Sequence, residues 1–293
     1  MHSGLVYAAL AFAWWGLFPL YFRLVTKVPA PEILAHRVVW CLLCLAALLT
    51  GRRQWGWLRQ VLRQPRVLAA FIASALLIGA NWLAYIWAVN HGHVIEASLG
   101  YFITPLVNVL LGVTLLHERL RRLQWLALAV AAAGVLWLTV QAGQPPWIAL
   151  ALAISFGGYG LLRKIAVLGA LEGLTLETLL LAPLALLVLG IAASQGTASF
   201  PAPDVLTNLW IIALGPITAV PLLLFAAGAR RLSMATLGIV QYLGPTIQFL
   251  LGVSVFGEPF SGARFVGFAG IWLALVIYTL DGWRISRAAM AAG

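Results

Sequence analysis

The residues of this chain best suited to chemistry are two charged side chains that stand inside long apolar segments. Glu96 lies about one helical turn into the apolar segment 94–116, and Arg37 lies at a similar depth in the segment 32–50. A charge at the centre of a membrane helix costs roughly 2.5–3.5 kcal/mol, so a charged residue in such a place is a candidate functional residue. A carboxyl group there could bind and release a proton, and a guanidinium could bind a carboxylate.

Each of these two residues also has a plainer interpretation. Glu96 could be an acid in the first turn of a helix, which stays ionised and interacts favourably with the helix dipole. Arg37 could extend its guanidinium to the lipid headgroups. A third reading pairs the two side chains with each other as a gate, because pairing lowers the cost of placing either charge in the membrane.

A second pair of charges follows from an internal repeat. At a fixed spacing of 140 residues, Arg163 corresponds to Arg23 and Glu177 corresponds to Arg37. Arg163 and Glu177 lie near the opposite membrane face and could form a matching closure. The alternative is ordinary charge at the membrane edge.

Uncharged polar side chains gather in four of the apolar segments. Such groups line a wet cavity or bridge neighbouring helices, and a bridge contributes about 0.6 kcal/mol. We expect cavity lining for Tyr101, Gln241 and Tyr242, which stand beside two prolines, and interhelical hydrogen bonds for Asn108 and Gln248. The full set is Asn81, Tyr85, Asn90, Tyr101, Asn108, Tyr159, Gln241, Tyr242 and Gln248.

Four tryptophans accompany these polar residues. Their rings could stack on an aromatic or cationic ligand. Packing between helices and anchoring at the membrane interface are the other common uses of tryptophan in such proteins. The four are Trp14, Trp15, Trp82 and Trp87.

Two prolines stand at matched positions inside apolar segments, Pro105 and Pro245. Each removes one backbone hydrogen bond and frees a carbonyl group, which predicts two kinked helices. Glu118 and Glu258 follow these segments at the same spacing, and we expect both to cap helices.

No pattern in the sequence indicates a metal, a cofactor or a catalytic centre. His91 and His93 have no further ligand nearby, and no P-loop is present for ATP. A membrane-embedded enzyme would need a nucleophile with a base. His36 and Glu96 are acid–base groups at one depth, but no serine or cysteine constellation accompanies them.

The elements that must position these residues follow from the composition. The chain is 63% hydrophobic and 9% charged, too apolar for a water-soluble globule of 293 residues. A membrane helix needs about 20 mostly apolar residues, and the absence of period-two alternation excludes barrel strands. The fold class predicted is all-α, with ten transmembrane helices at 5–25, 32–50, 67–89, 94–116, 123–141, 147–165, 174–193, 206–228, 233–256 and 263–282.

The ten segments form two halves of five, residues 1–143 and 144–293. The motif Leu110–Val113 recurs at Leu250–Val253, 140 residues later. Because five is an odd number, the second half must enter the membrane from the opposite face, which makes the halves inverted repeats. Such pairs are typical of secondary transporters.

The positive charges predict the orientation of the chain. If the N-terminus is cytoplasmic, 14 of the 18 lysines and arginines lie in cytoplasmic segments. Both termini are then cytoplasmic, which makes Arg37 with Glu96 an outer gate and Arg163 with Glu177 an inner gate. The net charge of +10 is spread over short loops, which argues against nucleic acid as a partner.

The basic segment 51–66 is predicted to be an interfacial helix on anionic lipid, anchored by Trp55 and Trp57.

Several stretches together resemble the RarD branch of the EamA transporters, in the drug/metabolite transporter superfamily. They are 13–21 (AWWGLFPLY), 32–40 (EILAHRVVW), 81–90 (NWLAYIWAVN), 96–102 (EASLGYF) and 241–245 (QYLGP). The resemblance covers essentially the whole chain. It implies a bacterial inner-membrane permease in which spans 1, 3, 4, 6, 8 and 9 surround a cavity, while spans 5 and 10 lie at the edge.

The sequence therefore predicts a secondary transporter of small amphipathic or aromatic metabolites or drugs, working by alternating access. Its partners are a small-molecule substrate, the lipid bilayer and, as a coupling ion, protons, in a monomer or a homodimer. The alternatives are a passive uniporter or channel, or a membrane-embedded enzyme.

Overall fold

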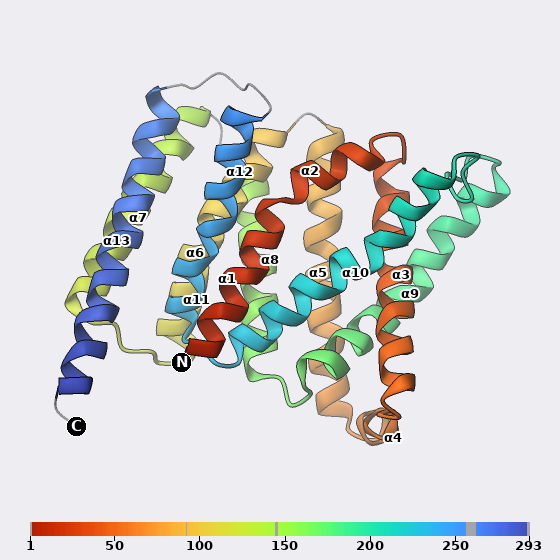
Figure 1. Ribbon diagram of the computed structural model, residues 1–293, viewed down its shortest axis with the longest axis horizontal. Helices are drawn as coiled ribbons and strands as arrows, with labels where there is room; N and C mark the ends of the chain where they lie inside the picture. Colours follow the sequence, from red (N-terminus) through yellow and green to blue (C-terminus); the bar gives the residue numbers. More distant parts are fainter. Residues whose placement is uncertain (1, 92, 144–145, 256–261, 292–293) are drawn as a thin grey trace.

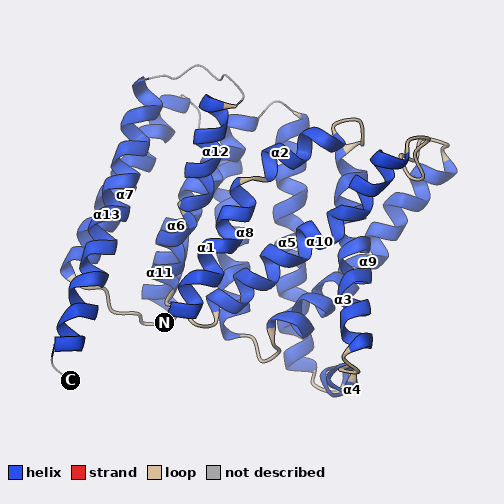
Figure 2. Ribbon diagram, in the orientation of Figure 1, coloured by secondary structure: helices blue, strands red, loops and turns tan. Residues whose placement is uncertain are grey.

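The chain forms a bundle of helices. The computed structural model describes residues 2–91, 93–143, 146–255 and 262–291, and Figure 2 shows helices joined by loops throughout these ranges. The longer helices are α1 (His2–Gly16), α3 (Ala30–Gly51), α5 (Pro65–Asn90), α6 (Val94–Leu115), α7 (Arg122–Ala142), α8 (Trp147–Ile165), α9 (Ala170–Ser194), α10 (Val205–Ala229), α11 (Met234–Gln241), α12 (Leu243–Ser254) and α13 (Gly262–Ala291). The short elements are α2 (Phe18–Phe22), a 3₁₀ turn (Arg23–Val25) and α4 (Gly56–Leu62).

Polar residues and one glycine set several helix ends. The carboxylate of Asp204 accepts a hydrogen bond from the N–H of Thr207 at 2.9 Å and caps α10, and this bond lowers the pKa of the carboxyl group. The hydroxyl of Ser233 accepts from the N–H of Thr236 at 3.1 Å and caps α11. Gly143 ends α7 at a φ of 72°, which glycine adopts without strain.

The helices lie side by side in one wide bundle (Figure 1). α7 and α13 pack against each other at one end, α3 and α9 pack at the other, and α10 crosses obliquely between them. The start of α1 and the end of α13 lie on the same face of the bundle, which is called the terminus side below. The edge position of α7 and α13 agrees with what the family resemblance implies for spans 5 and 10.

Nine stretches of the described residues are long and apolar enough to cross a membrane, and α6 adds a shorter apolar stretch, Leu99–Leu115. The chain is thus a multi-pass helical membrane protein. Each segment predicted from the sequence contains at least one helix.

Two predicted spans are interrupted. The segment 5–25 ends its first helix at Gly16 and resumes at Phe18, because Pro19 lacks the N–H that would continue the helix. The segment 233–256 breaks into α11 and α12 at Tyr242, since Pro245 cannot bond to the carbonyl of Gln241. Pro105, in contrast, stands inside α6, which remains one helix. The matched prolines therefore do not have matched effects: one helix is continuous and the other span is broken.

The basic segment 51–66 is helical only at α4, residues 56–62. Trp55 donates to the hydroxyl of Thr50 at 3.0 Å. Trp57 packs on a cluster with Val61, Phe71 and Leu176, against the rest of the protein. The helix is shorter than predicted because Arg53, at a φ of 54°, turns the chain just before it.

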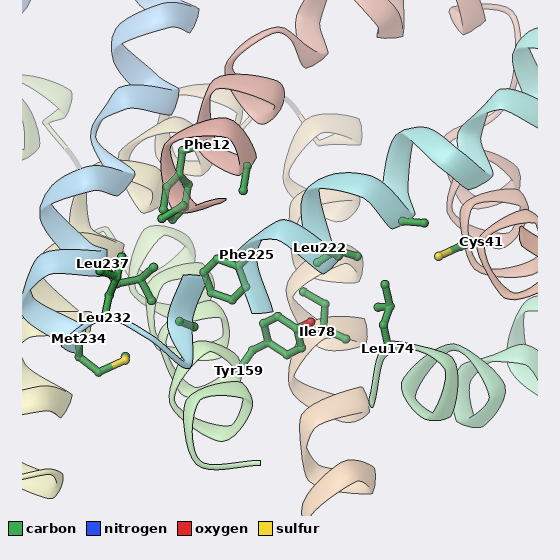
Figure 3. Close-up of a cluster of buried hydrophobic side chains, with 14 of the residues drawn as sticks. Phe12, Cys41, Ile78, Tyr159, Leu174, Leu222, Phe225, Leu232, Met234 and Leu237 are labelled. Carbon is green, nitrogen blue, oxygen red and sulfur yellow. The ribbon is translucent and has the colours of Figure 1, made fainter. Parts of the chain in front are cut away.

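The largest core cluster fills the middle of the bundle on the terminus side and joins residues far apart in the sequence. Figure 3 shows Phe12 of α1, Tyr159 of α8 and Phe225 of α10 converging on Met234 and Leu237 of α11. The rings of Tyr159 and Phe225 stack 5.9 Å apart. Since neither half of the chain could form this cluster alone, it holds the two halves together.

Candidate functional site

A cavity of about 300 Å³ lies in the half of the bundle away from the termini. Helices from both halves of the chain form it: α1 with α2, α3, α5 and α6 from the first half, and α8, α10, α11 and α12 from the second. Apart from α3, these are the spans that the family resemblance places around a cavity. Its walls are Phe12, Trp15, Phe18, Pro19, Phe22, Arg37, Asn81, Trp82, Tyr85, Ala97, Gly100, Tyr101, Thr104, Leu152, Phe156, Leu222, Gln241, Gly244, Pro245 and Gln248.

Arg37 is the charged side chain among the described residues that line this cavity. Its Nε–H donates to the hydroxyl of Thr218 on α10 at 3.1 Å. Its guanidinium carbon lies 4.6 Å from the ring centre of Trp82 and 5.9 Å from that of Phe18, distances at which a ring face attracts a cation. Among the described residues, no carboxylate forms an ion pair with Arg37. The guanidinium is thus held in place by a hydroxyl and two rings, and it is half-buried.

Three amide side chains add neutral hydrogen-bonding groups. Asn81 donates to the carbonyl of Leu152 at 2.9 Å and to the hydroxyl of Ser155 at 3.0 Å. Gln248 donates to the carbonyl of Trp15 at 3.1 Å, which joins α12 to α1. These bonds fix the amide planes of α5 and α12 at the cavity wall.

Gln241 also reaches the cavity, and it accepts a hydrogen bond from Asn108 at 2.8 Å. The bond joins α6 to α11, so the interhelical role predicted for Asn108 is confirmed. The bond from Gln248 to α1 confirms the same role for Gln248.

Aromatic rings cover most of the remaining wall. Tyr85 and Tyr101 lie 6.0 Å apart, centre to centre. Trp15 lies 5.7 Å from Phe156 on α8. Behind this wall, Phe225 of the core cluster lies 5.3 Å from Phe156, centre to centre.

Three residues predicted to be near a ligand lie elsewhere. Trp14 is on the outer surface, 39% exposed, and its neighbour Trp15 lines the cavity instead. Tyr242 is fully buried in a separate cluster and donates to the carbonyl of Phe102 at 3.3 Å. Tyr159 is fully buried in the core cluster and does not line the cavity.

Three residues that the sequence analysis singled out lie wholly or partly outside the described part of the chain. Glu96 and Asn90 belong to α6 and α5, but their side chains lie outside the described part of the chain, and Glu258 lies outside it altogether. The pairing of Arg37 with Glu96 therefore stays a prediction. His91 and His93 both stack on Trp87, at 4.4 and 5.6 Å.

A buried cluster of polar groups surrounds Arg163 and Glu177 on the terminus side. The two side chains are each 1% exposed, with Nη1 of Arg163 3.6 Å from Oε1 of Glu177. Glu177 also accepts hydrogen bonds from Ser74 at 2.5 Å and Tyr159 at 3.3 Å. A β-carbon on Gly173 would lie 1.9 Å from Nη1 of Arg163, so this close approach needs a glycine.

Arg163 is held from a second direction by backbone carbonyls. Its Nη2 donates to Ala170 at 3.1 Å and to Gly169 at 3.4 Å, at the start of α9. The pair therefore ties the end of α8 to the first turns of α9. It is a buried charge pair, and not the membrane-edge charge that was the alternative.

A second polar cluster on the terminus side centres on Glu118. Its carboxylate accepts from the backbone N–H groups of Met234 at 2.7 Å and Ala235 at 3.1 Å, and it lies 3.8 Å from Nζ of Lys164. Lys164 also donates to the carbonyl of Leu232. The capping role predicted for Glu118 is confirmed, but the helix it caps is α11 in the other half of the chain.

Several residues of the site escaped the sequence reasoning. Thr218 is a lone hydroxyl in the middle of the apolar segment that forms α10. Nothing in the sequence indicates that it accepts a hydrogen bond from Arg37. Ser74 is likewise a lone hydroxyl in an apolar segment. Phe12 and Phe156 are indistinguishable in sequence from core phenylalanines, so only the packed bundle reveals that they reach the cavity.

Apolar helices around an aromatic cavity define a multi-pass membrane protein with an internal cavity. Comparison with known proteins gives the family. Residues 2–140 match the EamA-like transporter family. An uncharacterized transporter of Pseudomonas aeruginosa is 49% identical over 98% of this chain and 96% of its own length. The protein RarD of Escherichia coli is 46% identical over 95% of this chain and 94% of its own length.

The chain therefore belongs to the EamA-like transporter family, in its RarD-type branch. A further relative, the chloramphenicol-sensitive protein RarD of Pseudomonas aeruginosa, is 36% identical over 92% of this chain and 91% of its own length. The fold is also similar to a solved crystal structure with a TM-score of 0.73, covering 95% of this chain and 98% of that one at 23% identity. The names of the family and of its members describe transporters, not enzymes.

Proposed function

We propose that the chain is a secondary transporter that moves small amphipathic or aromatic compounds across the bacterial inner membrane by alternating access. The observation that carries the proposal is a cavity built by helices from both halves of the chain. A site at the junction of two halves can be exposed to either membrane face when the halves move relative to each other.

Ten spans in two inverted halves, residues 1–143 and 144–293, are part of this proposal. The starts of three helix pairs support it, because each pair is separated by the same 140 residues as the sequence motifs. The pairs are Ala30 of α3 with Ala170 of α9, Pro65 of α5 with Val205 of α10, and Val94 of α6 with Met234 of α11. In Figure 1, α3 and α9 start on opposite faces of the bundle, as inversion requires.

The terminus side is the inner gate in this proposal. Arg163 with Glu177 and Lys164 with Glu118 bind α8 to α9 and α11 there. Tyr159 connects this region to the cavity, since its hydroxyl reaches Glu177 and its ring lies 5.9 Å from that of Phe156 in the cavity wall. A cargo that displaces Phe156 would therefore disturb the closure.

The terminus side is also the cytoplasmic side in this proposal, by the distribution of arginine and lysine. Cysteine labelling in cells tests it, in a Cys41→Ala/Cys44→Ala background. Ala198 and Gln54 are both exposed, in loops on opposite faces. An impermeant maleimide should label Ala198→Cys from outside and leave Gln54→Cys unlabelled, whereas the reverse pattern refutes the orientation.

Protons are the coupling ion that we propose, with Glu96 as the group that carries them. Glu96→Gln keeps the size of the side chain and removes the titratable group. Proteoliposomes with the Glu96→Gln variant should exchange cargo but lose the uphill transport that a pH gradient drives in the original protein. Unchanged uphill transport would assign Glu96 a structural role and direct the search to Glu177.

Counterflow in proteoliposomes tests the proposed function itself. Chloramphenicol is one probe, because the name of a relative connects it with this branch, and aromatic metabolites of similar size complete the panel. Preloaded liposomes should accumulate labelled probe transiently, and a pH gradient should change the level if protons are coupled. Transport that ignores the gradient would indicate a uniporter, and chemical conversion of the probe would indicate an enzyme.

A further inference from the structure

We infer that the cargo is a small organic anion, a carboxylate attached to an aromatic or other flat apolar group, and that Arg37 binds the carboxylate. The inference rests on the proposed function, since it assigns a chemical class to the cargo of the same cavity. It is carried by the charge of the cavity, by the geometry around Arg37 and by the nature of the walls.

The described walls of the cavity carry one charged side chain, that of Arg37. Lysine, histidine, aspartate and glutamate are absent from this described lining. A cation in a low-dielectric cavity without a counter-ion is costly, so a bound anion gains the attraction that the empty site leaves unused. A cationic cargo would instead be repelled by the guanidinium.

The geometry around Arg37 suits a carboxylate. Thr218 takes the Nε–H, and the rings of Trp82 and Phe18 lie beside the guanidinium carbon. In the described contacts the two Nη groups make no hydrogen bond to protein. A guanidinium fixed in this way presents two parallel N–H donors, the arrangement that binds both oxygens of one carboxylate.

The walls around this charge suit a flat apolar group. Trp15, Tyr85, Tyr101 and Phe156 present rings to the same space, and rings of a cargo stack well on such faces. A volume of about 300 Å³ is at the lower end of ligand pockets, which run from about 300 to 1,000 Å³. One ring with a short acidic chain fits these limits.

A quaternary or primary amine is the main competitor, because aromatic walls also attract cations. Arg37 itself already occupies the neighbourhood of Trp82 at 4.6 Å and of Phe18 at 5.9 Å. An amine placed among these rings would stand beside a like charge, with no carboxylate in the described lining to compensate it. The competitor is thus disfavoured by the same residue that favours the acid.

Binding to purified protein in detergent tests the inference, with a series on one phenylpropyl skeleton and one acyclic acid for comparison. The probes are 3-phenylpropionate, its neutral amide, the corresponding amine, phenylalanine as the zwitterion, and hexanoate as an acid without a ring. We expect 3-phenylpropionate to bind at least about 10-fold more tightly than the amide and the amine, and hexanoate to be weaker for lack of stacking. Equal binding of acid and amide, or tighter binding of the amine, overturns the inference.

The variants Arg37→Gln and Arg37→Lys complete the test. We expect Arg37→Gln to weaken binding of 3-phenylpropionate by about 10- to 100-fold while binding of the amide stays unchanged. Arg37→Lys should keep part of the affinity, because lysine keeps the positive charge but lacks the two parallel N–H donors of the guanidinium. Arg52→Gln, in an exposed loop, is the matched control and should bind like the original protein. An Arg37→Gln variant that binds the acid normally refutes the assignment.

Counterflow separates failure of this inference from failure of the proposed function. If neutral probes are transported and no acid binds, the transporter proposal stands and the anion assignment is wrong. If the acid binds through Arg37 but no probe undergoes counterflow, the ligand class stands and the transport proposal is wrong.

Discussion

Arg37 and Arg163 are both arginines in membrane-spanning helices, but their surroundings differ in almost every respect. Arg163 is buried and faces Glu177 at 3.6 Å, and two backbone carbonyls take further bonds from it. Arg37 is half-buried in the wall of a cavity, with a hydroxyl and two rings as its described partners. The first arginine has a carboxylate partner in the protein, whereas the second has none among the described side chains.

The sequence repeat makes the contrast sharper. Arg37 of α3 and Glu177 of α9 are 140 residues apart, and each stands seven residues after the first residue of its helix, Ala30 and Ala170. One copy of this position carries a cation at the cavity and the other carries an acid in a buried pair. The comparison teaches that matched positions of the two halves share a place in their helices but have different surroundings, a cavity wall for Arg37 and a buried ion pair for Glu177.

The largest expected effect comes from breaking the buried pair. Glu177→Ala leaves Arg163 as a buried charge without its carboxylate, and we expect a loss of about 3–5 kcal/mol in the free energy of unfolding. Thermal unfolding in detergent measures it. The double variant Arg163→Met/Glu177→Leu should recover most of that loss, because two apolar residues need no counter-ion. A double variant as unstable as Glu177→Ala would mean that the pair is not the cause.

A smaller effect is expected from crowding the same pair. In Gly173→Ala the new methyl group would meet Nη1 of Arg163 at 1.9 Å and Phe71 at 2.8 Å, so either side chain must shift. Overpacking of this kind costs about 1–3 kcal/mol. Gly190→Ala, on the same helix with nothing within 4 Å, is the matched control and should unfold at the original temperature. Equal melting temperatures for the two variants would show that Arg163 has room to move.

A still smaller effect is expected at the other polar cluster on the terminus side, the one around Glu118. Glu118→Gln keeps the shape of the side chain but removes the charge that attracts Lys164 and the first N–H groups of α11. Removal of a helix cap costs about 0.5–2 kcal/mol. Ser233→Ala removes a neutral cap from the same helix and serves as the comparison. If Glu118→Gln unfolds like the original protein, the charge of Glu118 does not contribute to stability.

The helices could be predicted from the sequence because their signal is local. Each predicted apolar segment contains helix, and the starts of α3 and α6 lie within two residues of the predicted ones. What the apolar pattern could not locate was the interruption of a span, because Pro19, Pro105 and Pro245 have different effects in different packing. Whether a proline breaks a helix depends on how its neighbours satisfy the freed carbonyl, which is a property of the bundle.

The site could be predicted in part for the same reason. Asn81, Tyr85, Tyr101, Gln241 and Arg37 reach the cavity, as polar residues in apolar segments often do. The choice between neighbouring residues was beyond sequence reasoning. Trp14 and Trp15 differ by about 100° around one helix, and so do Gln241 and Tyr242, since the backbone at Tyr242 is also helical. Such choices are fixed by packing between the halves, which no local pattern records.

The smallest effect on stability is expected at Arg37, and it decides whether the comparison is sound. Arg37→Met keeps an unbranched apolar stem, and removes the charge, one hydrogen bond to Thr218 and the attraction of Trp82. These contacts contribute about 0.5–1.5 kcal/mol each, but the variant also removes the cost of a cation without a described counter-ion. The terms oppose each other, so we expect the free energy of unfolding to change by less than about 1 kcal/mol. Binding of an organic acid should be lost in the same sample. Measured beside Glu177→Ala under one set of conditions, Arg37→Met should therefore separate function from stability. A loss as large as that of Glu177→Ala would show that Arg37 also holds the fold together and that the two arginines are less different than their contacts indicate.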